Sequence, residues 1–145
     1  MWPEWTPEGL LPAGVWQASW EEAVSALGTT NRRQTLLWGL LEAMKALGSA
    51  GCSKLWLDGS FVTDAQAPRD YDACWDWQGV DRSMLDPVLI DYTPIGRARM
   101  KAKYLGDLFI AGTEGSSGKP FVEFFQRARD GATKGIVLLN PKEVA

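Results

Sequence analysis

The sequence predicts one α+β domain, in which helices flank a small mixed β-sheet. Apolar side chains recur at helical spacing between residues 19 and 47, whereas residues 54–58 and 70–77 alternate in the manner of strands. The chain has 145 residues, and 46% of them are hydrophobic, which is enough to form the core of a single domain. We therefore expect residues 1–145 to fold as one soluble unit.

The first 18 residues are rich in tryptophan and proline. Proline fixes φ and lacks a backbone donor, so this composition favours an extended arm over a helix. Exposed aromatic side chains often mark binding surfaces. The arm therefore either packs on its own domain or contacts a protein partner, and both interpretations stay open for Trp2, Trp5 and Trp16.

Two helices are expected before residue 50. Ser19 and Glu22 have the spacing of a capping box, which predicts a short helix that ends near Gly28. Asn31 is expected to cap a second helix, whose apolar residues continue at helical spacing up to Leu47.

Four segments are expected to form strands: residues 54–58, 70–77, 87–92 and 135–139. One face of the segment 70–77 carries acidic residues, whereas the other carries Tyr71, Ala73, Trp75 and Trp77 and is the better candidate for the core. Residues 97–103 alternate basic and apolar side chains, but their residue types favour a helix. Further on, we expect a flexible loop over residues 112–120 and a helix over 121–128.

Composition excludes several classes of protein. Without histidine, the chain has no Ser-His-Asp triad, no Cys-His pair and no histidine ligand for zinc. A formal net charge of −3 argues against a nucleic-acid coat protein. The longest apolar stretch, residues 35–47, is interrupted by Glu42 and Lys45 and is too short to span a bilayer. We expect no membrane segment, no signal peptide and a cytoplasmic location.

The candidate chemistry lies between residues 59 and 72. Asp70 and Asp72 project from one face of a predicted strand, about 6–7 Å apart along the chain. Carboxylate pairs of this kind bind Mg²⁺ together with water and substrate phosphates. The backbone amides around Gly59 and Ser60, if they open a helix, would cradle a phosphate.

This region resembles a known superfamily. Gly59-Ser60, followed after nine residues by Asp70-Tyr71-Asp72, is similar to the signature of the polymerase-β-like nucleotidyltransferases, especially of their minimal bacterial members. The run of residues 57–63 also resembles a small uncharacterised bacterial and phage family that carries this motif. The similarity covers residues 55–92, roughly a quarter of the chain. Arg69 departs from the pattern, because minimal members often have serine before the first acid.

The resemblance implies a nucleotidyltransferase-like fold and an activity. Gly59 and Ser60 would hold a nucleoside triphosphate, and Asp70 and Asp72 would bind Mg²⁺ or Mn²⁺. A third acid on a neighbouring strand would complete the metal site, and we assign it to Asp91 at the end of the strand expected over residues 87–92. The reaction would move a nucleoside monophosphate to an acceptor hydroxyl of a protein or an RNA and release pyrophosphate.

Basic side chains near the acids have a possible supporting role. Arg69 could contact a phosphate, and the cluster over residues 97–103, including Lys101 and Lys103, could steer a triphosphate or an RNA end toward the metal site. Solvated surface charges are the alternative for both.

Two other functions stay open. The chain could be a catalytically inactive module of the same fold, acting as an antitoxin-like or regulatory partner through its tryptophan-rich arm. It could also be a structural protein in which the motif is coincidental. The position of the third acid separates this last reading from the others, because a shared metal site requires it on the same side of the sheet.

Overall fold

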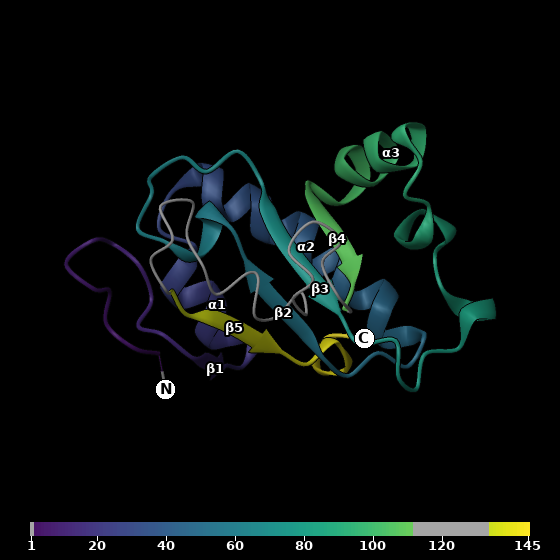
Figure 1. Cartoon of the computed structure of the whole chain (residues 1–145), viewed down its shortest axis with the longest axis horizontal. Coiled ribbons are helices and arrows are strands. Elements are labelled where there is room, and N and C mark those ends of the chain that lie inside the picture. Colours follow the sequence, from purple (N-terminus) through teal and green to yellow (C-terminus); the bar gives the residue numbers. More distant parts are fainter. Residues whose placement is uncertain (1, 112–133) are drawn as a thin grey trace.

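A five-stranded sheet forms the centre of the structure (Figure 1). The computed structural model describes residues 2–111 and 134–145. The strands lie side by side in the order β1 (Val15–Gln17), β5 (Ile136–Leu139), β2 (Leu55–Asp58), β3 (Tyr71–Trp75) and β4 (Gly106–Ile110).

Neighbouring strands run in both relative directions. β1 is parallel to β5, and β3 is parallel to β4, whereas β2 is antiparallel to both of its neighbours, β5 and β3. The predicted mixed sheet of an α+β domain is confirmed.

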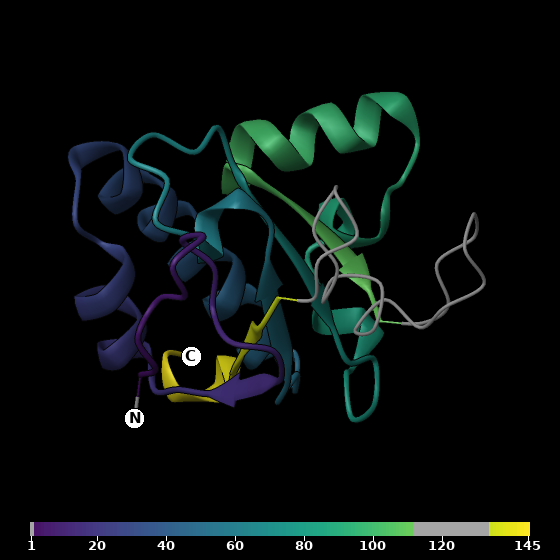
Figure 2. The same ribbon diagram turned by 60° about the vertical axis from the view of Figure 1, so that its left-hand side comes forward.

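Helices α1 (Trp20–Leu27) and α2 (Asn31–Ser49) cover one face of the sheet (Figure 2). The capping box that begins α1 is present, because the Glu22 amide donates to Ser19 Oγ and the Ser19 amide donates to Glu22 Oε1, both at 3.1 Å. The cap of α2 is Thr30 rather than Asn31. Thr30 has the extended backbone of a cap residue, and its Oγ accepts from the Arg33 amide at 3.2 Å.

The core lies between α2 and the sheet. The face of β3 that carries Tyr71, Ala73 and Trp75 is buried, as predicted. Trp77, which was predicted on the same face, lies beyond the end of β3 and is 37% exposed. The apolar stripe of α2 packs on this face with its neighbours in the sheet; the buried residues include Leu36, Leu40, Met44, Leu47, Leu55, Leu57, Val137 and Leu139. Packing on this side therefore fixes which side chains of each strand point away from the core.

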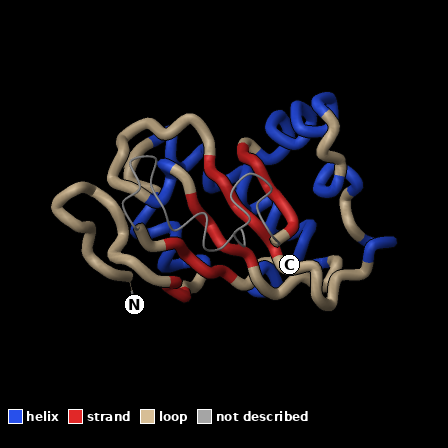
Figure 3. The backbone as a smooth tube through the Cα atoms, in the orientation of Figure 1, coloured by secondary structure: helices blue, strands red, loops and turns tan. Residues whose placement is uncertain are grey.

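The strand expected over residues 87–92 is wrong. The segment Pro87–Ile90 is a 3₁₀ turn, η3, which lies outside the sheet in Figure 3. Asp86 accepts a hydrogen bond from the Val88 amide at 3.1 Å, and Pro87 occupies the first helical position. An aspartate before a proline begins a helical turn, and this local signal outweighs the short apolar alternation.

The next segment forms α3 (Pro94–Tyr104), which confirms the helix favoured by the composition of residues 97–103. The loop and helix expected over residues 112–120 and 121–128 lie outside the described residues. Within those residues, no helix has the length and apolar character needed to cross a membrane.

The tryptophan-rich arm packs on its own domain. Trp2, Trp5 and Trp16 are partly buried against the core, and the indole nitrogen of Trp16 donates to the Pro12 carbonyl oxygen at 2.8 Å. The end of the arm forms β1, which pairs with the edge of β5. A role for the arm in binding a protein partner stays a prediction.

A buried arginine joins the start of α2 to the long connection between β2 and β3. Arg33 is 2% exposed. Its guanidinium donates to the carbonyl oxygens of Phe61 at 2.7 Å, Thr63 at 2.5 Å and Ala65 at 2.8 Å. It also lies over the Phe61 ring, 5.1 Å from the centroid. This single side chain therefore holds the first half of the connection.

The second half is held by the preceding residue of α2. Arg32 donates to the Pro68 carbonyl oxygen at 3.0 Å and to the Arg69 carbonyl oxygen. Two successive arginines thus fix the path of the chain from Gly59 to Asp70.

We expect Arg33→Lys to destabilise the protein by at least about 2 kcal/mol, because an ammonium cannot reproduce the three-way donation of a buried guanidinium. Urea denaturation measures this loss. Arg32→Lys, at an exposed position, is the control and should cost less than about 1 kcal/mol. Equal losses for the two variants would contradict the role assigned to Arg33.

Candidate metal and phosphate site

Three carboxylates lie at one level of the sheet, on three adjacent strands. Asp58 of β2 pairs with Asp72 of β3, and Asp72 pairs with Asp107 of β4. Residues directly opposite one another project from the same face. Asp70 precedes Asp72 by two positions and follows the same alternation. The end of β2 and the starts of β3 and β4 meet beside α3 at the upper edge of the sheet in Figure 1.

Asp58, Asp72 and Asp107, together with Asp70, form what we call the acidic row. Two lysines neutralise the ends of this row. Lys134 Nζ lies 2.7 Å from Asp58 Oδ1, and both side chains are almost fully buried. Lys101 Nζ of α3 lies between two carboxylates, 3.0 Å from Asp70 Oδ2 and 3.2 Å from Asp107 Oδ2. Among the described residues, no ion pair reaches Asp72 in the middle of the row.

The central carboxylate is electrostatically unfavourable when ionised. Burial, followed by the charges of Asp70, Asp107 and Asp58, raises the pKa of Asp72 to about 6. Burial also raises the pKa of Asp58, although Lys134 opposes this shift. A cluster of like charges in a partly buried setting favours a cation.

Gly59 turns the chain immediately after β2. Its φ of +84° is a conformation that side-chain-bearing residues rarely adopt, and a Cβ there would lie 2.6 Å from Asp72 Oδ2. Ser60 follows and begins η1 (Ser60–Val62), a single 3₁₀ turn and not the α-helix considered from the sequence. The turn thus places a backbone segment without a side chain close to Asp72 in the acidic row.

Asp91 does not join the row. It follows η3, and its Oδ1 accepts from the Thr93 amide at 3.1 Å and from Thr93 Oγ at 2.6 Å, which lowers its pKa. The expectation that Asp91 faces Asp70 and Asp72 from a neighbouring strand is therefore wrong. That place is taken by Asp107.

The predicted basic residues are divided between three places. Lys101 lies at the acids, but Lys103 lies on another side of α3, with its Nζ 2.6 Å from Asp86 Oδ2. The Arg69 side chain is exposed, and its backbone carbonyl accepts from Arg32. The structure therefore brings Gly59, Asp70, Asp72 and Lys101 together, with Ser60 next along the chain.

The chain matches a model of a protein family. A family model described as a family of unknown function (DUF6932) matches residues 3–140. The chain belongs to DUF6932. The comparison with curated proteins and the comparison with solved structures each gave no match.

Two residues of the acidic row in this DUF6932 protein were not assigned to the site from the sequence. Asp58 precedes Gly59 directly, and Asp107 lies in the run Gly106-Asp107-Leu108-Phe109 after a basic helix. An acid beside an apolar run was the available signal for Asp107. Because a strand was wrongly expected over residues 87–92, the third acid was assigned to Asp91 instead.

The raised pKa of Asp72 gives this DUF6932 protein a specific pH dependence without divalent ions. A carboxyl whose folded-state pKa exceeds its unfolded value binds protons more tightly when folded, so its contribution to stability is lost as pH rises from about 4 through about 6. We expect Asp72→Asn to remove this loss and to raise the free energy of unfolding at pH 7 by up to about 3 kcal/mol.

Urea unfolding in EDTA, from pH 4.5 to 7.5, measures the effect. Asp76→Asn, four residues farther along the chain and just beyond the end of β3, is the matched control. An unchanged pH slope in Asp72→Asn would contradict the electrostatic account of the row.

Proposed function

We propose that this protein is a nucleotidyltransferase that depends on Mg²⁺ or Mn²⁺ and transfers a nucleoside monophosphate from a nucleoside triphosphate to an acceptor hydroxyl. The observation that carries the proposal is the alignment of Asp72 and Asp107 on adjacent strands, with Asp70 beside them and the Gly59 turn next to Asp72. The resemblance of the Gly-Ser and Asp-Tyr-Asp motifs supports the same chemistry.

The donor set fits a divalent cation. Asp70, Asp72 and Asp107 would hold it, because carboxylate oxygens are the ligands that Mg²⁺ prefers. In the described part of the chain, no three such groups are already gathered as a cage. The Lys101 ammonium lies between two of them, so cation binding requires Lys101 to move aside and the carboxylates to turn. A cation held there would supply positive charge to neutralise the triphosphate and polarise the reacting phosphate.

The protein's own groups position the two substrates. The backbone at Gly59 and Ser60 receives the phosphates of the donor, because glycine leaves room for close approach. Asp107 accepts the proton of the acceptor hydroxyl. The hydroxyl oxygen forms a bond to the α-phosphorus, the bond from that phosphorus to the β-phosphate breaks, and pyrophosphate leaves with the electron pair.

One observation favours the inactive alternative. Lys101 and Lys134 already neutralise three of the four acids, namely Asp58, Asp70 and Asp107. A protein of this fold that no longer binds a metal would need such neutralisation. In that case the protein would act as an antitoxin-like or regulatory partner. A measurement of nucleotide binding distinguishes the two functions, because the inactive module is not expected to bind the triphosphate.

We expect Asp107→Asn to weaken binding of Mg²⁺ and nucleoside triphosphate at least tenfold, the effect of about 1.4 kcal/mol, and to abolish transfer. Asp91→Asn is the matched control and should bind like the wild type, because Asp91 is engaged by Thr93. Calorimetric titration of the four ribonucleoside triphosphates with Mg²⁺ measures both variants. The proposal fails if the wild type binds none of them, or if Asp91 rather than Asp107 is required.

A second test uses two glycines with nearly the same φ. Gly59 has a φ of +84° and Gly79 a φ of +82°, but a Cβ at Gly79 would meet only the Gly51 carbonyl oxygen, at 3.6 Å. Alanine should cost about 1 kcal/mol of stability through backbone strain at Gly79, and more at Gly59, where its methyl group also meets Asp72. Only Gly59→Ala should also weaken triphosphate binding, because its methyl group would press on the Asp72 carboxylate.

Thermal unfolding and calorimetry separate the two effects. Equal binding by Gly59→Ala, Gly79→Ala and the wild type would show that the Gly59 turn does not hold the donor.

A further inference from the structure

We propose that the acceptor is the end of a single-stranded nucleic acid, and that it binds in a hollow beside Asp107. This inference rests on the proposed nucleotidyltransferase function. The hollow has a volume of about 370 Å³ and is lined by Tyr92, Pro94, Arg97, Ala98, Lys101 and Asp107. That volume lies in the range of sites for small ligands and would hold one terminal nucleotide.

The hollow and the Gly59 turn lie on opposite flanks of the acidic row. Gly59 follows β2, Asp72 lies on the central strand β3, and Asp107 lies on β4 and lines the hollow. A donor held at Gly59 and a second substrate in the hollow would therefore meet at the acids. The hollow is the place for the acceptor because the proposed function assigns the donor to the other flank.

The charge of α3 favours a phosphorylated acceptor. The helix carries Arg97, Arg99, Lys101 and Lys103 and no acidic residue, in a chain whose formal net charge is −3. Arg97 and Lys101 are four positions apart and so lie on one face of the helix, both lining the hollow. A local group of cations attracts the backbone of a nucleic acid even in an acidic protein.

An aromatic ring in the hollow is fixed and accessible. Tyr92 is 38% exposed, and its hydroxyl oxygen accepts from the Ile110 amide at 3.0 Å. Its ring centroid lies 5.9 Å from that of Phe109, and the Arg97 guanidinium lies 5.5 Å from the Phe109 centroid. Proteins that bind single strands combine basic grooves with aromatic rings on which bases stack. A protein side chain with a hydroxyl has neither a phosphate nor a base beside it, so it would use neither the basic side chains nor the aromatic ring of the hollow.

The test measures binding of labelled single strands of about ten nucleotides to the full chain with Mg²⁺, by fluorescence anisotropy, using one RNA and one DNA with free 3′ hydroxyls. We expect Arg97→Gln to weaken binding at least about fivefold and to reduce the dependence of log K on log salt by about 0.7. Tyr92→Leu should weaken binding without changing that dependence.

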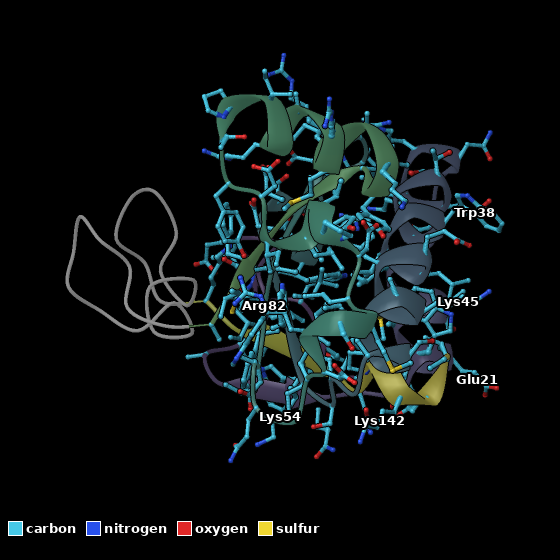
Figure 4. The ribbon with its side chains drawn as sticks, turned by 90° about the vertical axis from the view of Figure 1, so that its right-hand side faces the viewer. Glu21, Trp38, Lys45, Lys54, Arg82 and Lys142 are labelled. Carbon is cyan, nitrogen blue, oxygen red and sulfur yellow. The ribbon has the colours of Figure 1, made fainter. Side chains whose placement is uncertain are left out.

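Arg82→Gln is the matched control. Arg82 is another exposed arginine over an aromatic ring, 5.9 Å from the Trp77 centroid, and Figure 4 shows it well away from α3. This variant loses the same charge and should bind the strands like the wild type. Thermal unfolding of each variant verifies that it is folded.

Calorimetry with nucleoside triphosphate and Mg²⁺ separates this inference from the proposed function. Wild-type protein that binds the triphosphate but neither strand would overturn the inference and leave the function intact, and a protein acceptor would then replace the nucleic acid. Loss of triphosphate binding in Arg97→Gln would assign the hollow to the donor and also overturn it. Preference for RNA or DNA identifies the source of the strand, and either preference supports the inference.

Discussion

The constraint on which the site depends is the register of β2, β3 and β4. Like charges directly opposite one another destabilise a sheet, yet this register sets Asp58, Asp72 and Asp107 side by side. Shifting any of these strands by one residue would separate the acids, but it would also turn its apolar face out of the core. The packing of α2 on Leu57, Ala73 and Leu108 therefore holds the acids together against their own repulsion.

The connection between β2 and β3 depends on a second constraint, which is the satisfaction of its backbone. Connections of this length leave many carbonyl groups without partners in regular structure. Arg33 and Arg32 satisfy five of them from the first turn of α2. As a result, the Gly59 turn and Asp70, at the two ends of the connection, have fixed positions relative to one another.

Local patterns explain what the sequence predicted and what it did not. The capping box at Ser19, the apolar stripe of α2 and the two-faced alternation of β3 depend on near neighbours, and they were predicted. The partner of Asp72 on β4 depends on a strand pairing with α3 in between, which no local pattern encodes. At residues 87–90, the apolar alternation predicted a strand, whereas the cap signal predicted a helical turn. The strand prediction was wrong, and so was the assignment of the third acid to Asp91 that depended on it.

Lys101 links the acidic row to the basic hollow. The four carboxylates of Asp58, Asp70, Asp72 and Asp107, with the ammonium groups of Lys101 and Lys134, leave a local charge of −2. Under the proposed function, one divalent cation would neutralise that charge, and Lys101 would have to leave Asp70 and Asp107. Lys101 already lines the hollow together with Arg97, and its ammonium would then have no carboxylate to neutralise. Cation binding would thus make the hollow more positive and strengthen its attraction for a phosphate.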